Sequence, residues 1–133
     1  MIHALDPETG DVILGSAGVL VGRSATTHWL AVDWLTELGA IPKADRVVCD
    51  GKYVSAAGVS AGLDMALMLT AKIAGEPTAK AIQLLIEYDP HPPFDCGSVD
   101  KAPADIVASM RALRDFILHD IRRQNRQTQP CGH

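Results

Sequence analysis

The chain has 133 residues, of which 47% are hydrophobic and 21% are charged, and its formal net charge is −4. This composition predicts one folded domain over residues 1–133 rather than a disordered or fibrous chain. The negative charge argues against nucleic acid as a partner. Three widely spaced cysteines fit neither a disulfide framework nor a metal-binding pair, and residues 1–6 lack the apolar run of a signal peptide or anchor. We therefore expect a cytoplasmic protein with no membrane partner, metal or cofactor.

The first third of the chain predicts short elements. Residues 1–5 fit a very short strand, and residues 24–28 have the β-branched content of another. Residues 29–38 carry apolar side chains at helical spacing, and Gly39 is typical of a helix end.

A β-hairpin is predicted near residues 46–56, because Asp50-Gly51 separates two apolar runs and both residues tolerate a positive φ. A helix follows between Gly62 and Gly75, and it is apolar on nearly every side, which predicts that protein encloses it. Ser60 is a candidate N-cap of this helix, and Asp64 would then lie in its first turn, near the positive end of the helix dipole.

Two more helices complete the chain. One begins near Pro77 and ends before Asp89, and a long amphipathic helix covers residues 103–123. The proline-rich segment between them cannot be regular structure and is expected to be held by Phe94. Residues 124–133 form a polar tail that we expect to be flexible.

The balance of elements predicts assembly. Helices this apolar normally cover a central sheet, yet few strands are apparent in the sequence. The chain should therefore expose apolar surface as a monomer and form a homo-oligomer, with a dimer as the simplest case, or join a chain that supplies the missing surface.

Four blocks, in this order, resemble the DJ-1/PfpI superfamily and most closely its isocyanide (isonitrile) hydratase-like branch. They are LGSAGVLVGRSATTHW (14–29), LTELGA (35–40), VSAAGVSAGLDMAL (54–67) and IEYDPHPPFD (86–95). The resemblance implies an α/β fold, part of a flavodoxin-like sandwich of the class I glutamine amidotransferase type, helix-rich and with short strands. The family's N-terminal half, with most of its parallel strands and a catalytic carboxylate, has no counterpart in this sequence.

The resemblance also implies a nucleophile elbow, a cysteine on a tight strand-to-helix turn that reads Cys-Thr-Gly in this branch. The corresponding residues here are Glu8, Thr9 and Gly10. In the family, the elbow thiolate attacks the carbon of an isonitrile, and the hydrated product is an N-substituted formamide. A carboxylate is a far poorer nucleophile, so the resemblance predicts that this chain alone is inactive.

Three residues are candidate catalytic residues, each with a simpler explanation beside it. Thr9 could belong to an anion-binding helix start or be a plain helix cap. His28, in the block beside the family's elbow, could be an acid/base or a hydrogen-bonded structural histidine. Asp64 resembles a family aspartate, but stabilisation of the helix dipole would also explain it. Cys49 is expected to be a small core residue.

Three functions follow from this sequence. In the first, the chain is an inactive relative of isonitrile hydratase. In the second, it is half of a split cysteine-dependent hydratase that a partner chain completes. The third is a non-enzymatic sensor or regulatory domain.

Overall fold

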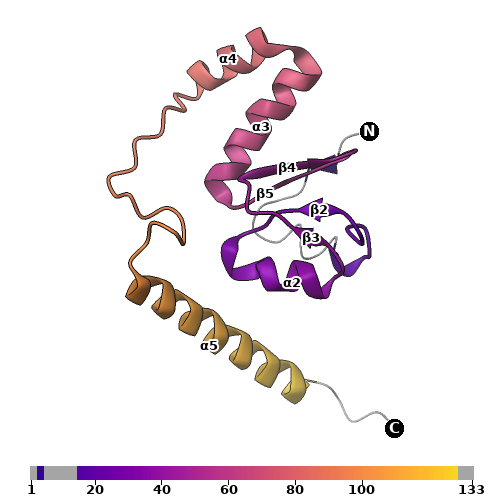
Figure 1. Ribbon diagram of the computed structural model, residues 1–133, viewed down its shortest axis with the longest axis vertical. Helices are drawn as coiled ribbons and strands as arrows, with labels where there is room; N and C mark the ends of the chain where they lie inside the picture. The colour runs from indigo at the N-terminus through magenta and orange to yellow at the C-terminus, as the bar shows by residue number, and fades with distance from the viewer. Residues whose placement is uncertain (1–2, 5–14, 129–133) are drawn as a thin grey trace. The chain divides into compact units, whose positions relative to one another are not determined.

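The computed structural model describes residues 3–4 and 15–128 of the chain (Figure 1). The chain divides into two compact units, residues 1–90 and residues 91–133. The first unit contains all the strands in the described residues and two apolar clusters, so it holds the candidate site. Each unit is considered by itself below.

A three-stranded sheet lies at the centre of the first unit, in the order β1-β5-β4. β5 (Tyr53–Ala56) pairs parallel with β1 (His3–Ala4) and antiparallel with β4 (Val47–Asp50). The predicted hairpin and the predicted N-terminal strand are therefore confirmed. The turn is shifted by one residue: Asp50 pairs with Tyr53, and Gly51, with a φ of 61°, begins the two-residue loop.

A second, two-stranded sheet pairs β2 (Ser24–Ala25) parallel with β3 (Ile41–Pro42). The connection between them is helical, with a 3-10 turn η1 (Trp29–Ala31) running into α2 (Val32–Glu37). The predicted helix over 29–38 is thus confirmed. Its buried side packs into a cluster beside the two strands, made of Leu20, Ala25, Leu35 and Ala40. The strand expected over 24–28 is shorter: it ends at Ala25, and the backbone N–H of the next residue, Thr26, donates to the Ser55 side chain.

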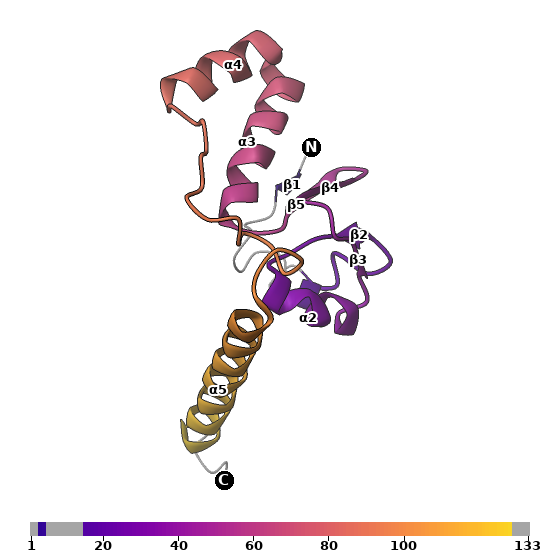
Figure 2. The same cartoon turned by 60° about the vertical axis from the view of Figure 1, so that its left-hand side comes forward.

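The central helix is α3 (Val59–Ala74), which packs across the β4–β5 hairpin and against α4 (Glu76–Leu85) (Figures 1 and 2). Its contact with the sheet is a small cluster that consists of Val54, Ala56, Ala61 and Met65. The expectation that protein encloses α3 on most sides is wrong for this chain: Leu63 is 43% exposed and Ile73 is 73% exposed. The N-cap is Gly58, so the prediction that Ser60 caps the helix is also wrong.

The second unit consists of an irregular segment and one long helix, α5 (Ala104–Thr128), five residues longer at its C-terminal end than predicted. In the irregular segment Lys101 Nζ donates to Asp95 Oδ1 at 2.6 Å. Phe94 is 77% exposed, so it does not hold this segment, contrary to the sequence-based expectation. The proline content accounts for the lack of regular structure without any such anchor.

Large apolar side chains are exposed in both units. At the end of α4, Leu84 and Leu85 are 82% and 83% exposed, and in α5 Phe116 is 71% exposed. Among the described residues, none of the helices combines the length and apolar character needed to cross a membrane.

Candidate functional site

The residues that the resemblance assigns to the elbow are Glu8, Thr9 and Gly10. All three lie outside the described residues, so the candidate role of Thr9 remains a prediction. The described part of the candidate site has two pieces: the segment that follows β2, and the turn that leads from β5 into α3. These two pieces are called the wall of the site below.

His28 lies three residues after the end of β2 and is the N-cap residue of η1. Its Nδ1 accepts a hydrogen bond from the backbone N–H of Leu30 at 3.3 Å, and its carbonyl accepts one from Ala31 at 2.7 Å. Because Nδ1 is an acceptor, the proton of the neutral ring is assigned to Nε2. The hydrogen bond that the simpler, structural explanation expects for His28 is therefore present.

Gly58 brings the start of α3 against this ring. A Cβ placed on Gly58 would lie 3.7 Å from His28 Cδ2, which is ordinary van der Waals contact. The backbone of Gly58 is fully extended, with φ and ψ both −179°, and the next residue starts the helix. The geometry thus joins two blocks of the sequence, 24–29 and 54–62, into one surface.

A hydroxyl group of β5 binds the backbone just after β2. The Thr26 backbone N–H donates to Ser55 Oγ at 2.9 Å, and Thr26, Thr27 and Ser55 are each 2–3% exposed. Buried polar groups are costly unless they are hydrogen-bonded, so Ser55 stabilises the point where the β2 strand ends. Asp50 adds a second tie, since its Oδ2 accepts from the Ser24 backbone N–H at 2.7 Å.

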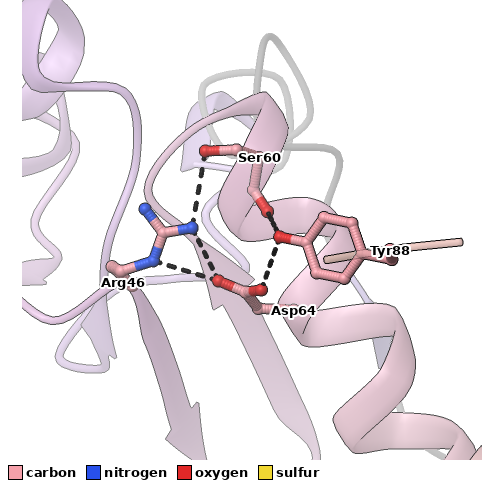
Figure 3. A network of polar contacts seen from close by, with 4 residues as sticks. All are labelled: Arg46, Ser60, Asp64 and Tyr88. Carbon is pink, nitrogen blue, oxygen red and sulfur yellow. Dashed lines mark hydrogen bonds and ion pairs between the residues drawn. The ribbon is translucent and has the colours of Figure 1, made fainter. Parts of the chain in front are cut away.

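Asp64 does not lie in the first turn of α3, so a stabilising contact with the first-turn N–H groups does not account for it. Instead, Arg46 Nε and Nη2 both donate to its Oδ2, at 3.0 and 2.6 Å (Figure 3). The Tyr88 hydroxyl donates to its Oδ1 at 2.7 Å. Both carboxylate oxygens are therefore occupied, which favours a structural rather than a proton-transferring role.

These contacts shift the acidities of two groups. Burial raises the pKa of Asp64, but the hydrogen bonds from Arg46 and Tyr88 and the charge of Arg46 outweigh it and hold the pKa below its ordinary value of 3.8. The hydrogen bond to the Asp64 carboxylate, with burial and the nearby negative charge, raises the pKa of Tyr88 above 10.0. The arrangement therefore favours an ionised Asp64 and a neutral Tyr88.

The cysteines of the described region supply no elbow nucleophile. Cys49 is exposed rather than buried as expected, and Lys72 Nζ donates to its Sγ at 3.7 Å. Cys96 is half-buried in the second unit. Within residues 3–4 and 15–128, no cluster of three or more histidine, cysteine or acidic side chains is placed to hold a metal ion.

The sequence alone did not indicate Arg46, Ser55 or Tyr88. Each acts through a partner far along the chain: Arg46 and Tyr88 lie 18 and 24 residues from Asp64, and Ser55 lies 29 from Thr26. A pattern of neighbouring residues in the sequence cannot predict hydrogen bonds between residues so far apart. The available signal was membership of a resemblance block: Ser55 lies in the block over residues 54–67 and Tyr88 in the block over residues 86–95, whereas Arg46 lies in none.

The comparisons with known proteins agree with this geometry. Residues 9–72 match the DJ-1/PfpI family model. Isonitrile hydratase from Pseudomonas putida is 50% identical over 103 residues, covering 77% of this chain and 45% of that protein. An HTH-type transcriptional regulator, CdhR from Pseudomonas aeruginosa, is 37% identical over 76 residues, covering 54% of this chain and 22% of the regulator. The chain thus spans less than half the length of these relatives.

Solved structures give the same result. A THiJ/PfpI family protein from Pseudomonas syringae superposes with a TM-score of 0.76 at 45% identity, over 80% of this chain and 44% of that one. A DJ-1 superfamily protein from Salmonella typhimurium shares the fold, with a TM-score of 0.56 at 23% identity over 66% of this chain and 47% of its own. The predicted flavodoxin-like α/β class is therefore confirmed. The chain belongs to the DJ-1/PfpI superfamily and is similar to its isonitrile hydratase-like branch.

Proposed function

We propose that this chain carries the second part of an isonitrile hydratase-like site and does not itself hydrate isonitriles. The observation that supports the proposal is the closeness of His28 to the Gly58 turn, where a Cβ on Gly58 would lie 3.7 Å from His28 Cδ2. Both residues lie in blocks that resemble the isonitrile hydratase-like branch. Similarity to an isonitrile hydratase over most of the chain points to the same class of small molecule.

The chemistry explains why Glu8 matters. An isonitrile is hydrated when a thiolate forms a C–S bond to its terminal carbon, which is then protonated to give a thioimidate. Water adds to that carbon, the thiolate leaves, and the nitrogen gains a proton, so one water is consumed per formamide. A carboxylate at position 8 lacks the nucleophilicity of a thiolate toward the isonitrile carbon, so the first of these steps would fail.

The test compares the unaltered chain with Glu8→Cys. Alkyl isonitrile consumption is followed by its N≡C infrared stretch, and the formamide by mass spectrometry. We expect no formamide above the buffer rate from the unaltered chain, and little from Glu8→Cys, because the family's catalytic carboxylate lies in its N-terminal half. Substantial turnover by the single variant would contradict the proposal. Glu8→Ser is the matched control, since it removes the carboxylate without supplying a thiol.

A split hydratase is the alternative within the enzyme class. A partner chain would bring the elbow cysteine and the carboxylate, and this chain would contribute the wall that contains His28. Hydration that appears only when the two chains are mixed, and that is lost on alkylation of the partner's thiol, would favour this alternative over an inactive relative.

A sensor role is favoured by a different observation, the 37% identity to a transcriptional regulator over 76 residues. A sensor would bind a small molecule and release it unchanged. Saturable shifts of the His28 ring signals on addition of an isonitrile, without product, would support binding without turnover. No shift at any concentration would count against both the sensor and the isonitrile-binding wall.

We further propose that the chain assembles with itself. The exposed leucines at the end of α4 and the exposed Phe116 in α5 are unfavourable on the surface of a monomer. Light scattering at increasing protein concentration should show a homo-oligomer, and a monodisperse monomer throughout would contradict this. Leu85→Glu should shift the equilibrium toward the monomer if α4 contributes to the interface.

A further inference from the structure

The first turns of α3 are held by Arg46 rather than by a helix cap. The N-cap residue is Gly58, which has no side chain to cap the helix. The carbonyl of Arg46 accepts from the Ala57 N–H at 2.8 Å, just before the helix. The guanidinium of the same residue donates to Asp64, in the second turn, and to Ser60 Oγ at 3.4 Å. Arg46 thus contacts the strand-to-helix turn on both sides of Gly58.

A second contact comes from the end of α4. Tyr88 N–H donates to the Gln83 carbonyl at 3.1 Å, and Glu87 N–H donates to the Leu84 carbonyl at 3.1 Å. This pair of bonds is a Schellman motif, which normally places glycine where Glu87 lies. Glu87 is the one non-glycine residue with a positive φ in the described part of the chain, at 53°.

That motif directs Tyr88 onto α3. Its hydroxyl donates to Asp64 Oδ1 at 2.7 Å and lies 3.3 Å from the Ser60 carbonyl (Figure 3). Since a phenol has one proton, the shorter bond to the carboxylate dominates. The end of α4 and the start of α3 are therefore joined through a single carboxylate.

We propose that Arg46, Asp64 and Tyr88 form a clamp that positions Gly58 against His28, and that Asp64 is a positioning residue of this site. The term clamp is used below for these three residues. The inference that the clamp serves a binding wall rests on the proposed function. The clamp itself rests only on the contacts above.

The clamp is expected to fix a local geometry more than to stabilise the whole fold. The side chains of Arg46 and Asp64 are 58% and 37% exposed, and exposed ion pairs add little to global stability. What they determine is where the Gly58 turn lies. A shift there would change the surroundings of His28 Cδ2, 3.7 Å from the Cβ position at Gly58.

Tyr88→Phe tests the proposal, because it removes one hydroxyl and keeps the ring. Two NMR measurements on the 133-residue chain report on the clamp. The first is hydrogen exchange of the Gly62 amide, which donates to the carbonyl of the N-cap residue Gly58 at 2.9 Å. The second is the chemical shift of His28 Hδ2. We expect Gly62 to exchange about fivefold faster, as loss of one hydrogen bond implies, and the His28 signal to move. Tyr53→Phe is the matched control, since Tyr53 lies outside the clamp, and it should change neither.

Asp64→Asn gives a second, independent variant. It should reproduce both effects, whereas Arg46→Lys should give an intermediate shift because it keeps the charge but loses the forked geometry. If Gly62 exchanges faster while His28 Hδ2 stays unchanged, the clamp is only structural and the proposal is overturned. Unchanged exchange in Tyr88→Phe would overturn it as well. Neither measurement requires an isonitrile, so failure of the proposed function would leave this test intact.

Discussion

Replacing Glu87 by glycine should stabilise the protein. Glu87 follows α4 with a φ of 53°, a left-handed conformation that costs an L-residue about 1–2 kcal/mol. Glycine adopts it without that cost, but loses about 0.5–1 kcal/mol through its greater freedom in the unfolded chain. The expected net gain in the free energy of unfolding from the backbone alone is about 0.5–1 kcal/mol.

A matched variant separates the backbone from the charge. Glu87 also places a negative charge at the C-terminal end of α4, where the helix dipole disfavours it by about 0.3–1 kcal/mol. Both Glu87→Gly and Glu87→Ala remove the charge, but only glycine removes the backbone strain. The difference between these two variants therefore measures the relief of the left-handed strain minus the entropy that glycine loses on folding.

Urea unfolding followed by far-UV circular dichroism is the assay. With a slope of about 2 kcal/mol per molar urea, the midpoint of Glu87→Gly should lie about 0.25–0.5 M above that of Glu87→Ala. Amide exchange at Tyr88, whose N–H donates to Gln83, should slow in the glycine variant. If alanine stabilises as much as glycine, the strain does not exceed the entropy cost of glycine, and the reasoning is refuted.

Three further predictions concern the same unit. Gly75→Ala should destabilise by about 1–3 kcal/mol in urea, because its φ of 88° and ψ of 153° suit only glycine, and an unchanged midpoint would contradict this. Met65→Ala, in the cluster between α3 and β5, should cost about 2–3 kcal/mol in the same assay. In a Tyr53→Phe background, ultraviolet titration should show Tyr88 ionising above pH 10.0, and Asp64→Asn should lower that pKa. If Asp64→Asn leaves the titration unchanged, the two side chains are not coupled.

The pH dependence of the clamp follows from the same shifts. The pKa of Asp64 is lowered, so the stability that its carboxylate contributes is present above pH 3.8 and is lost as the pH falls through the lowered pKa. The pKa of Tyr88 is raised, so the stability that its hydroxyl contributes is present below pH 10.0 and is lost as the pH rises through the raised pKa. Exchange at Gly62 should accelerate at both extremes, and exchange that depends on pH only through its intrinsic chemistry would contradict the clamp.

Local signals in the sequence predicted most of the elements. Asp50-Gly51 predicted the hairpin, and helical spacing predicted α2, α4 and α5. The errors arose where the deciding partner is distant. Ser60 has the chemistry of an N-cap, but the extended Gly58 starts the helix two residues earlier. Cys49 lies in an apolar run, yet its position in β4 leaves it exposed.

The candidate site was predicted only in part. His28 could be named because it lies in a block with family resemblance, and the structure adds its contact with Gly58. The role of Asp64 could not be worked out from the sequence, because it is set by Arg46 and Tyr88, which come from other elements. The apolar character of α3 predicted that protein encloses it on most sides, but burial depends on what covers a helix. In this chain Ile73 remains 73% exposed.

The measurement that tests the central claim most directly is isonitrile hydration by the chain purified from its own cells, with intact mass determined across the size-exclusion profile. The account predicts that the fraction containing Glu8 in its unaltered form elutes as a homo-oligomer and forms no formamide above the buffer rate. Formamide production that follows this chain across the profile, with no second polypeptide in the same fractions, would contradict it.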